Sequence, residues 1–176
     1  MRKGGSIPTP STTFISGAMM NTRRDEARPW RVMPGPWDQE PDWAELDHAG
    51  LPCLLMRNGA GAWCGYVHVP PYHPCWREAA DDGDGHYYWP FVVHGGITWV
   101  GGRDFSDGRR LTTIGFDTNH FGDRAPERFR PTDPITGYYR NFEYAVAEVK
   151  SLAEQVTAYK PLEQMSNIFS GAAKED

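Results

Sequence analysis

Apolar residues recur every three or four positions near the C-terminus, which is the spacing of one face of an α-helix. Charged residues such as Glu143 and Lys150 lie off this stripe. Pro161 follows it and is expected to end the helix, because proline cannot continue one. The members of the stripe are Phe142, Ala145, Val146, Val149, Leu152, Ala153 and Val156.

Two apolar segments, LPCLLMR (51–57) and AWCGYVHVP (62–70), flank the turn NGAG and predict a β-hairpin. Side chains alternate between the two faces of a strand, so the residues of the second strand should divide into two sets. His68, as a strand residue, could lie at the surface. The sets are Trp63, Gly65, Val67 and Val69 on one face, and Cys64, Tyr66 and His68 on the other.

Two further strands are predicted in FVVHGGITWVGG (91–102) and RRLTTIGFD (109–117). The Gly95–Gly96 pair indicates a bulge or the close approach of a ligand, because glycine weakens a strand. Residues 21–50 place tryptophans among prolines and predict an irregular arm anchored on the core, with a short helix around Pro41–His48. Together these elements predict an α+β fold, in which a small, mostly antiparallel sheet packs against one long C-terminal helix.

A chain of 176 residues suits one domain, and we expect it at 21–160 between flexible tails at 1–20 and 161–176. The net charge of −5 makes nucleic acid an unlikely surface ligand, because such a surface needs a basic face. No apolar run approaches the ~20 residues that cross a bilayer, so we expect no membrane partner. The odd count of three cysteines argues against a disulfide framework and favours the cytoplasm.

The stretch GFDTNHFGD places Asp117, His120 and Asp123 three residues apart, directly after an apolar strand. One imidazole and two carboxylates suit a divalent metal ion such as Zn²⁺, Mn²⁺ or Fe²⁺. They equally suit a histidine general base that is oriented by an aspartate. The structural alternative is that both carboxylates cap backbone N–H groups of a turn, and that His120 packs or faces water.

Two other histidine segments could join this stretch. His94 precedes Gly95 and Gly96, whose missing side chains would admit a ligand, and His73 lies in the proline-stiffened segment HVPPYHP. The alternative for both histidines is a structural ring whose nitrogens are hydrogen-bonded. We expect Asp117, His120 and His94 to be catalytic, and His73, Gly95, Gly96, Tyr66 and Trp99 to bind the ligand. Cys64 lies within a strand beside Trp63 and is expected to be a buried, inert thiol.

Four blocks occur in a fixed order: WCGYVHVPPYHP (63–74), VHGGIT (93–98), GFDTNHFGD (115–123) and YRNFEYAVAEVKSLA (139–153). With these blocks the chain resembles a family of small proteins of unassigned function that are common in bacteriophages and prophages. The resemblance covers about residues 51–158. It implies a phage-related accessory protein that acts in the cytoplasm of the infected bacterial host.

Three functions are compatible with these patterns. The first is a small metal-assisted hydrolase or transferase that acts on a nucleotide-like or phosphorylated small molecule through the His/Asp pocket. The second is a non-catalytic inhibitor that binds a host defence complex, in the manner of an anti-CRISPR protein. Its contact surface would be the tryptophan-rich arm and the acidic loop Ala79–Gly85, because aromatic residues favour interface hot spots. The third is a small-ligand-binding module without chemistry.

Overall fold

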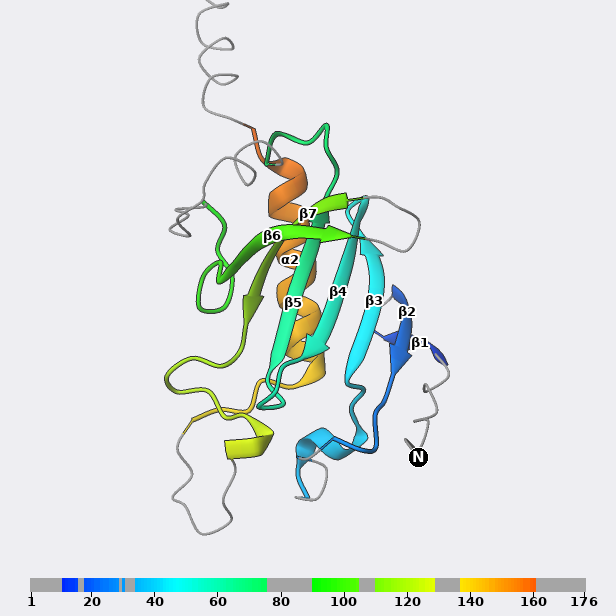
Figure 1. The fold of residues 1–176 in the computed structure, drawn as a ribbon, viewed down its shortest axis with the longest axis vertical. Helices are drawn as coiled ribbons and strands as arrows, with labels where there is room; N and C mark the ends of the chain where they lie inside the picture. The colour runs from blue at the N-terminus through cyan, green and yellow to red at the C-terminus, as the bar shows by residue number, and fades with distance from the viewer. Residues whose placement is uncertain are drawn as a thin grey trace, which may run out of the picture.

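The computed structural model describes residues 11–15, 18–28, 30, 34–75, 90–104, 110–128 and 137–160. Within them a seven-stranded sheet has the order β1-β2-β3-β4-β5-β7-β6, and neighbouring strands are antiparallel (Figure 1). The strands are β1 Ser11–Ile15, β2 Ala18–Arg23, β3 Trp43–His48, β4 Leu51–Arg57, β5 Trp63–Val69, β6 Trp99–Asp104 and β7 Arg110–Asp117. The helix α2 spans Phe142–Ala158, and short 3-10 turns η2 and η3 span Pro36–Gln39 and Pro126–Arg128.

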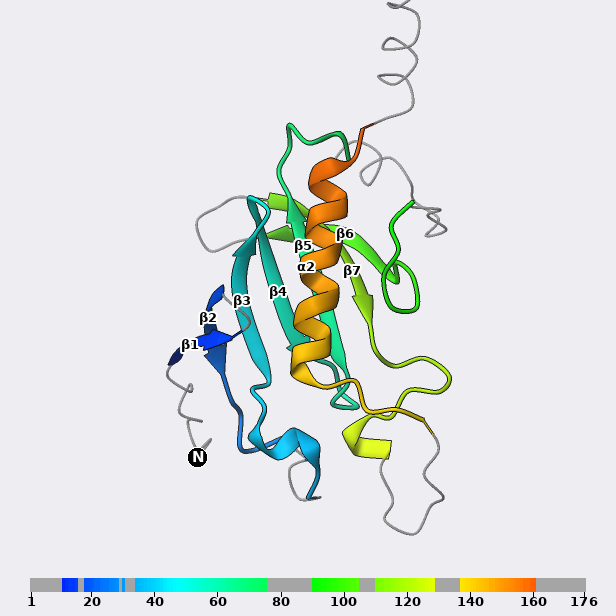
Figure 2. The same cartoon turned by 180° about the vertical axis from the view of Figure 1, so that it is seen from behind.

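The helix α2 covers one face of the sheet and runs along β3, β4 and β5 (Figure 2). All seven apolar residues of the sequence stripe are buried on it. The side chain of its N-cap, Asn141, accepts a hydrogen bond from the Tyr144 amide at 2.9 Å and so fixes where the helix begins. The expected α+β fold, with an antiparallel sheet packed against one long helix, is confirmed.

The two faces of β5 divide as the alternation predicts. Trp63, Val67 and Val69 belong to the core cluster that α2 completes. Gly65 also faces this core, where an added Cβ would lie 2.3 Å from Cε1 of Phe116. His68 on the opposite face is only 3% exposed, and its Nδ1 is hydrogen-bonded to Thr113 Oγ1 at 2.9 Å, so it does not lie at the surface.

Beyond β5 the sheet curls. In Figures 1 and 2 the strand β6 crosses the ends of β4 and β5 on the face opposite α2. The strand β6 therefore partly covers this face of β4, β5 and β7. The other face packs against α2 and carries the core. None of the helices in the described part of the chain is long and apolar enough to cross a bilayer.

Three expected boundaries are corrected. The helix around 41–48 is instead the strand β3, in which Ala44 and Leu46 are buried and Glu45 is exposed, a two-residue period that fits a strand. The strand expected over 91–102 begins only at Trp99. Residues 11–20, assigned to the tail, contribute to β1 and β2, and Met20 is buried in the core. The expected tail at 161–176 lies outside the described residues.

Candidate functional site

His94 lies in a turn rather than in a strand. The amide of Gly96 donates to the carbonyl of Val93 at 2.9 Å, and both Gly95 and Gly96 have positive φ, +67° and +83°. Such angles suit glycine in a turn and are incompatible with an extended ladder. This turn docks on α2, where the His94 amide donates to Glu148 Oε2 at 2.7 Å.

The imidazole of His94 is held by both ring nitrogens. Its Nε2 is 2.7 Å from Asp123 Oδ2, and its Nδ1 is 3.0 Å from the hydroxyl of Tyr144. A carboxylate can only accept, so Nε2 carries a proton, and Nδ1 is paired with the Tyr144 hydroxyl. Burial, followed by the charge of Glu148, raises the pKa of Tyr144, which keeps its hydroxyl protonated. The result is a chain of hydrogen bonds, Asp123–His94–Tyr144.

Asp123 is the hub of the cluster. Its side chain is only 3% exposed, and besides His94 it accepts from Arg140 Nε at 3.0 Å and from the His120 amide at 3.1 Å. Burial alone would raise the pKa of Asp123, but the hydrogen bonds from His94, Arg140 and the His120 amide together hold that pKa below its usual value. The carboxylate is therefore charged at neutral pH and fully engaged.

His120 and Asp117 form a second pair beside the first. The rings of His94 and His120 are 5.6 Å apart, and His120 Nε2 is 3.7 Å from Asp117 Oδ1. Asp117 also accepts from Thr98 Oγ1 at 2.8 Å and from the Asn119 amide at 2.9 Å. His120 Nε2 is buried and has no hydrogen-bond partner among the described residues, so its proton-transfer capacity is unused.

Gly95 positions the second imidazole. A Cβ at this position would lie 1.9 Å from His120 Nε2, so any other residue would occupy the place of the ring. The group that comes close to Gly95 is the His120 side chain, and the binding of a ligand at the two glycines stays a prediction. A Cβ at Gly96 would meet nothing within 4 Å.

The metal interpretation of Asp117, His120 and Asp123 stays a prediction. In the described part of the chain no group of three or more His, Cys, Asp or Glu side chains is arranged to hold a metal ion. The oxygens of Asp123 face the His94 ring and the guanidinium of Arg140.

Two other predicted parts of the site lie away from this cluster. His73 accepts a hydrogen bond from the Cys75 amide at Nδ1, and it lies near Val156 of α2. Val156 is twelve residues along the helix from Tyr144, which is about 18 Å at 1.5 Å per residue. Burial lowers the pKa of His73. Tyr66 and Trp99 lie together at a separate hollow on the open face of the sheet.

The expectation for Cys64 agrees with its environment. The residue is 8% exposed, and burial raises its pKa to about 11, so the thiol stays protonated at neutral pH. Cys53, Cys64 and Cys75 are all free and buried.

Sequence reasoning missed Tyr144, Glu148 and Arg140. Tyr144 and Glu148 are four residues apart and so share one face of α2, at the polar border of its apolar stripe. Arg140 immediately precedes the N-cap. Their i, i+4 spacing indicated a shared polar face of the helix. It did not show that the turn containing His94 packs against that face.

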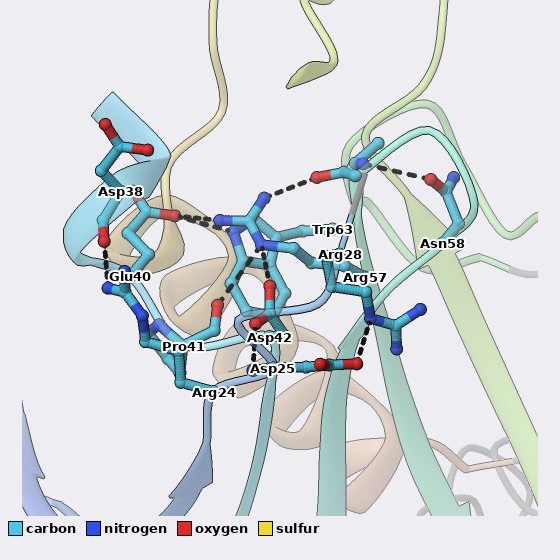
Figure 3. A network of polar contacts seen from close by, with 12 residues as sticks. Arg24, Asp25, Arg28, Asp38, Glu40, Pro41, Asp42, Arg57, Asn58 and Trp63 are labelled. Atoms are coloured by element: carbon cyan, nitrogen blue, oxygen red, sulfur yellow. Dashed lines mark hydrogen bonds and ion pairs between the residues drawn. The ribbon is translucent and has the colours of Figure 1, made fainter. Parts of the chain in front are cut away.

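A second polar network, also missed, is built on the buried Arg57 at the end of β4 (Figure 3). Its guanidinium is 2.6 Å from Glu40 Oε2 and 3.4 Å from Asp42 Oδ1, and it lies 4.3 Å from the centre of the Trp63 ring. It also donates to the Tyr139 hydroxyl at 2.9 Å. Burial raises the pKa of Tyr139. The network ties the arm and the residue preceding Arg140 to the sheet.

Two of the three arm tryptophans are buried: Trp30 and Trp37 are 2% and 1% exposed and do not contribute to the contact surface expected for a binding protein. Trp43 is half-buried. The other half of that expected surface, Ala79–Gly85, lies outside the described residues.

Comparison with protein-family models, with curated proteins and with solved structures finds no match to this chain. The phage-family resemblance therefore stays a prediction.

Acidification is expected to weaken the cluster around Asp123. A carboxyl group with a depressed folded-state pKa adds stability that is fully present above its unfolded pKa, about 3.9, and is lost as pH falls through the folded value. Asp123→Asn lacks this contribution. The difference in free energy of unfolding between wild type and Asp123→Asn, measured with urea, should shrink from pH 5 to pH 2.5. An equal difference at both pH values would contradict the role given to Asp123.

Proposed function

We propose that the protein is a hydrolase or transferase that works by acid–base catalysis at the paired His–Asp site. The observation that carries the proposal is the pairing of two imidazoles 5.6 Å apart, one in the chain Asp123–His94–Tyr144 and one with an unused ring nitrogen at His120. Two groups of this kind can take a proton from a nucleophile and give one to a leaving group. The Asp–His–hydroxyl order follows the logic of a catalytic triad.

The roles follow from the contacts. The imidazole of His120 would take the proton of the attacking water or hydroxyl, and Asp117, 3.7 Å from its Nε2, would stabilise the imidazolium. The hydroxyl of Tyr144, held in place by Nδ1 of His94, would give its proton to the leaving oxygen, and water would then return a proton to the phenolate. Asp123 fixes the tautomer of His94.

The proposed substrate is a phosphorylated or nucleotide-like small molecule. Arg140 donates from Nε to Asp123, and its terminal nitrogens make no hydrogen bond to another described residue. The side chain is 30% exposed and lies over the ring of Tyr144, 4.9 Å from its centre. A guanidinium held in this way offers a fork of donors to a phosphate beside the two imidazoles.

His120→Gln is expected to lower kcat by about 10²–10⁴-fold, the usual contribution of a general acid or base. Turnover would be measured on p-nitrophenyl phosphate, bis(p-nitrophenyl) phosphate and 2′,3′-cyclic nucleotides, together with the melting temperature. Phe121→Ala is the matched control, because Phe121 is the neighbouring residue and is fully exposed. Unchanged turnover in His120→Gln, or no wild-type turnover on any of these esters, would contradict the proposal.

A further inference from the structure

The face of the sheet opposite α2 carries two hollows that share one residue, Met56. The first, of about 220 Å³, is lined by β-strand residues on the curled side of the sheet: Met56, Tyr66, Trp99, Gly102 and Thr113. The second, of about 180 Å³, lies toward the N-terminal side and is lined by Met56, Arg23, Arg24, Asp25, Arg28, Asp42 and Trp43.

The first hollow has the size and lining of a socket for one side chain. Trp99 is 54% and Met56 is 37% exposed, so two large apolar side chains remain in contact with water. A cavity of ~150 Å³ already accepts benzene, whereas pockets for drug-sized ligands hold ~300–1,000 Å³. A hollow of about 220 Å³ therefore suits a single aromatic or large aliphatic group.

The second hollow offers one available cation. Arg24 is paired with Glu26, and Arg28 with Asp25. The guanidinium of Arg23 lies 4.3 Å from the centre of the Trp43 ring and makes no ion pair with another described residue. An arginine that stacks on an aromatic ring keeps its N–H groups directed outward, where they match a carboxylate.

The distance between the hollows indicates what occupies them. Tyr66 lies on β5 and Arg23 on β2, three strands apart in the order β2-β3-β4-β5. At ~4.8 Å per strand this is about 14 Å, which an extended peptide spans in about four residues. Residues i and i+4 of an extended segment point to the same side.

We propose that this open face binds an extended segment of a partner protein. The segment places an aromatic or large apolar side chain between Tyr66 and Trp99, and an acidic side chain about four residues away against Arg23. Met56 lies between the two side chains and contacts both. This inference does not rest on the acid–base function, because none of the four residues belongs to the His–Asp cluster.

The test begins with selection of a displayed random peptide library on the immobilised full chain. Enriched peptides are expected to carry Asp or Glu four positions from Phe, Trp, Tyr, Leu or Met. The Kd of the best peptide, measured by fluorescence anisotropy, should rise at least about tenfold with Trp99→Ala and with Arg23→Glu. Met56→Glu gives a second probe of the hollows should Trp99→Ala fold poorly, and Tyr72→Ala, at an 88% exposed ring, is the control.

A charge exchange makes the test specific. The same peptide with lysine in place of its acidic residue should bind Arg23→Glu more tightly than it binds wild type. Peptide binding that withstands both Trp99→Ala and Arg23→Glu would overturn the proposal. Binding of a thymidine decamer that is lost in Trp99→Ala would also overturn it, because the face would then bind nucleic acid. So would a dimer in analytical sedimentation that Trp99→Ala converts to a monomer, because the face would then bind a second copy.

Discussion

Arg57→Met is expected to lower the free energy of unfolding by about 3–5 kcal/mol, the usual cost of removing one partner from a buried ion pair. The side chain of Arg57 is 0% exposed, and those of Glu40 and Asp42 are 14% and 3% exposed, so both carboxylates would lose their cation inside the protein. Methionine keeps much of the apolar stem that packs beside Trp63. Urea unfolding followed by tryptophan fluorescence measures the effect, and the melting temperature should fall by about 2–4 °C per kcal/mol.

The exposed ion pair His48–Glu154 supplies the control for Arg57. Its side chains are 27% and 64% exposed. Pairs of this kind contribute about 0–1 kcal/mol, so Glu154→Gln should leave the unfolding curve almost unchanged. A loss no larger in Arg57→Met than in Glu154→Gln would show that the network in Figure 3 does not anchor the arm.

Gly95→Ala is expected to displace His120 and to lower turnover by a factor similar to that of His120→Gln. The added methyl group would lie 1.9 Å from Nε2, and a non-glycine residue at φ +67° costs about 1–2 kcal/mol besides. NMR signals of the His120 ring measure the displacement directly, whether or not a substrate is in hand.

Gly96→Ala is the matched control for this displacement. Its φ of +83° imposes a comparable backbone strain, yet its Cβ would meet nothing within 4 Å. It should lose stability without moving the His120 signals. If both variants shift these signals equally, contact with Gly95 does not position His120, and the assignment of that glycine is wrong.

The sequence was informative where one local pattern decided the structure. The apolar stripe of α2 is local and was predicted residue by residue, whereas six of the seven residues of β5 are buried whichever face they are on. The segment at 41–48 was misread because eight residues are too few to separate a helix from a strand, and pairing with β4 decided the outcome. The strand expected around His94 failed because two successive positive φ angles close a turn there.

The site was predicted in part for a similar reason. Asp117, His120 and Asp123 were recognisable because they follow a strand within one short loop. Their partners were not, since Tyr144 and Arg140 come from a helix whose position over the sheet is set by core packing. Arg57 was missed because its partners are also set by long-range packing. In the sequence it is only the polar residue at the end of an apolar strand, and Glu40 and Asp42 surround it once the arm has folded.

The placement of α2 has a consequence for how the chain is made. The strands β3, β4 and β5 leave the ribosome first, but the apolar face they share is covered only when residues 142–158 follow. At about 5–20 residues per second, the 89 residues from Val69 to Ala158 take roughly 4–18 s to synthesise. During that interval Leu55, Trp63 and Val67 have no helix to cover them. The core of the sheet can therefore close only after α2 has been synthesised.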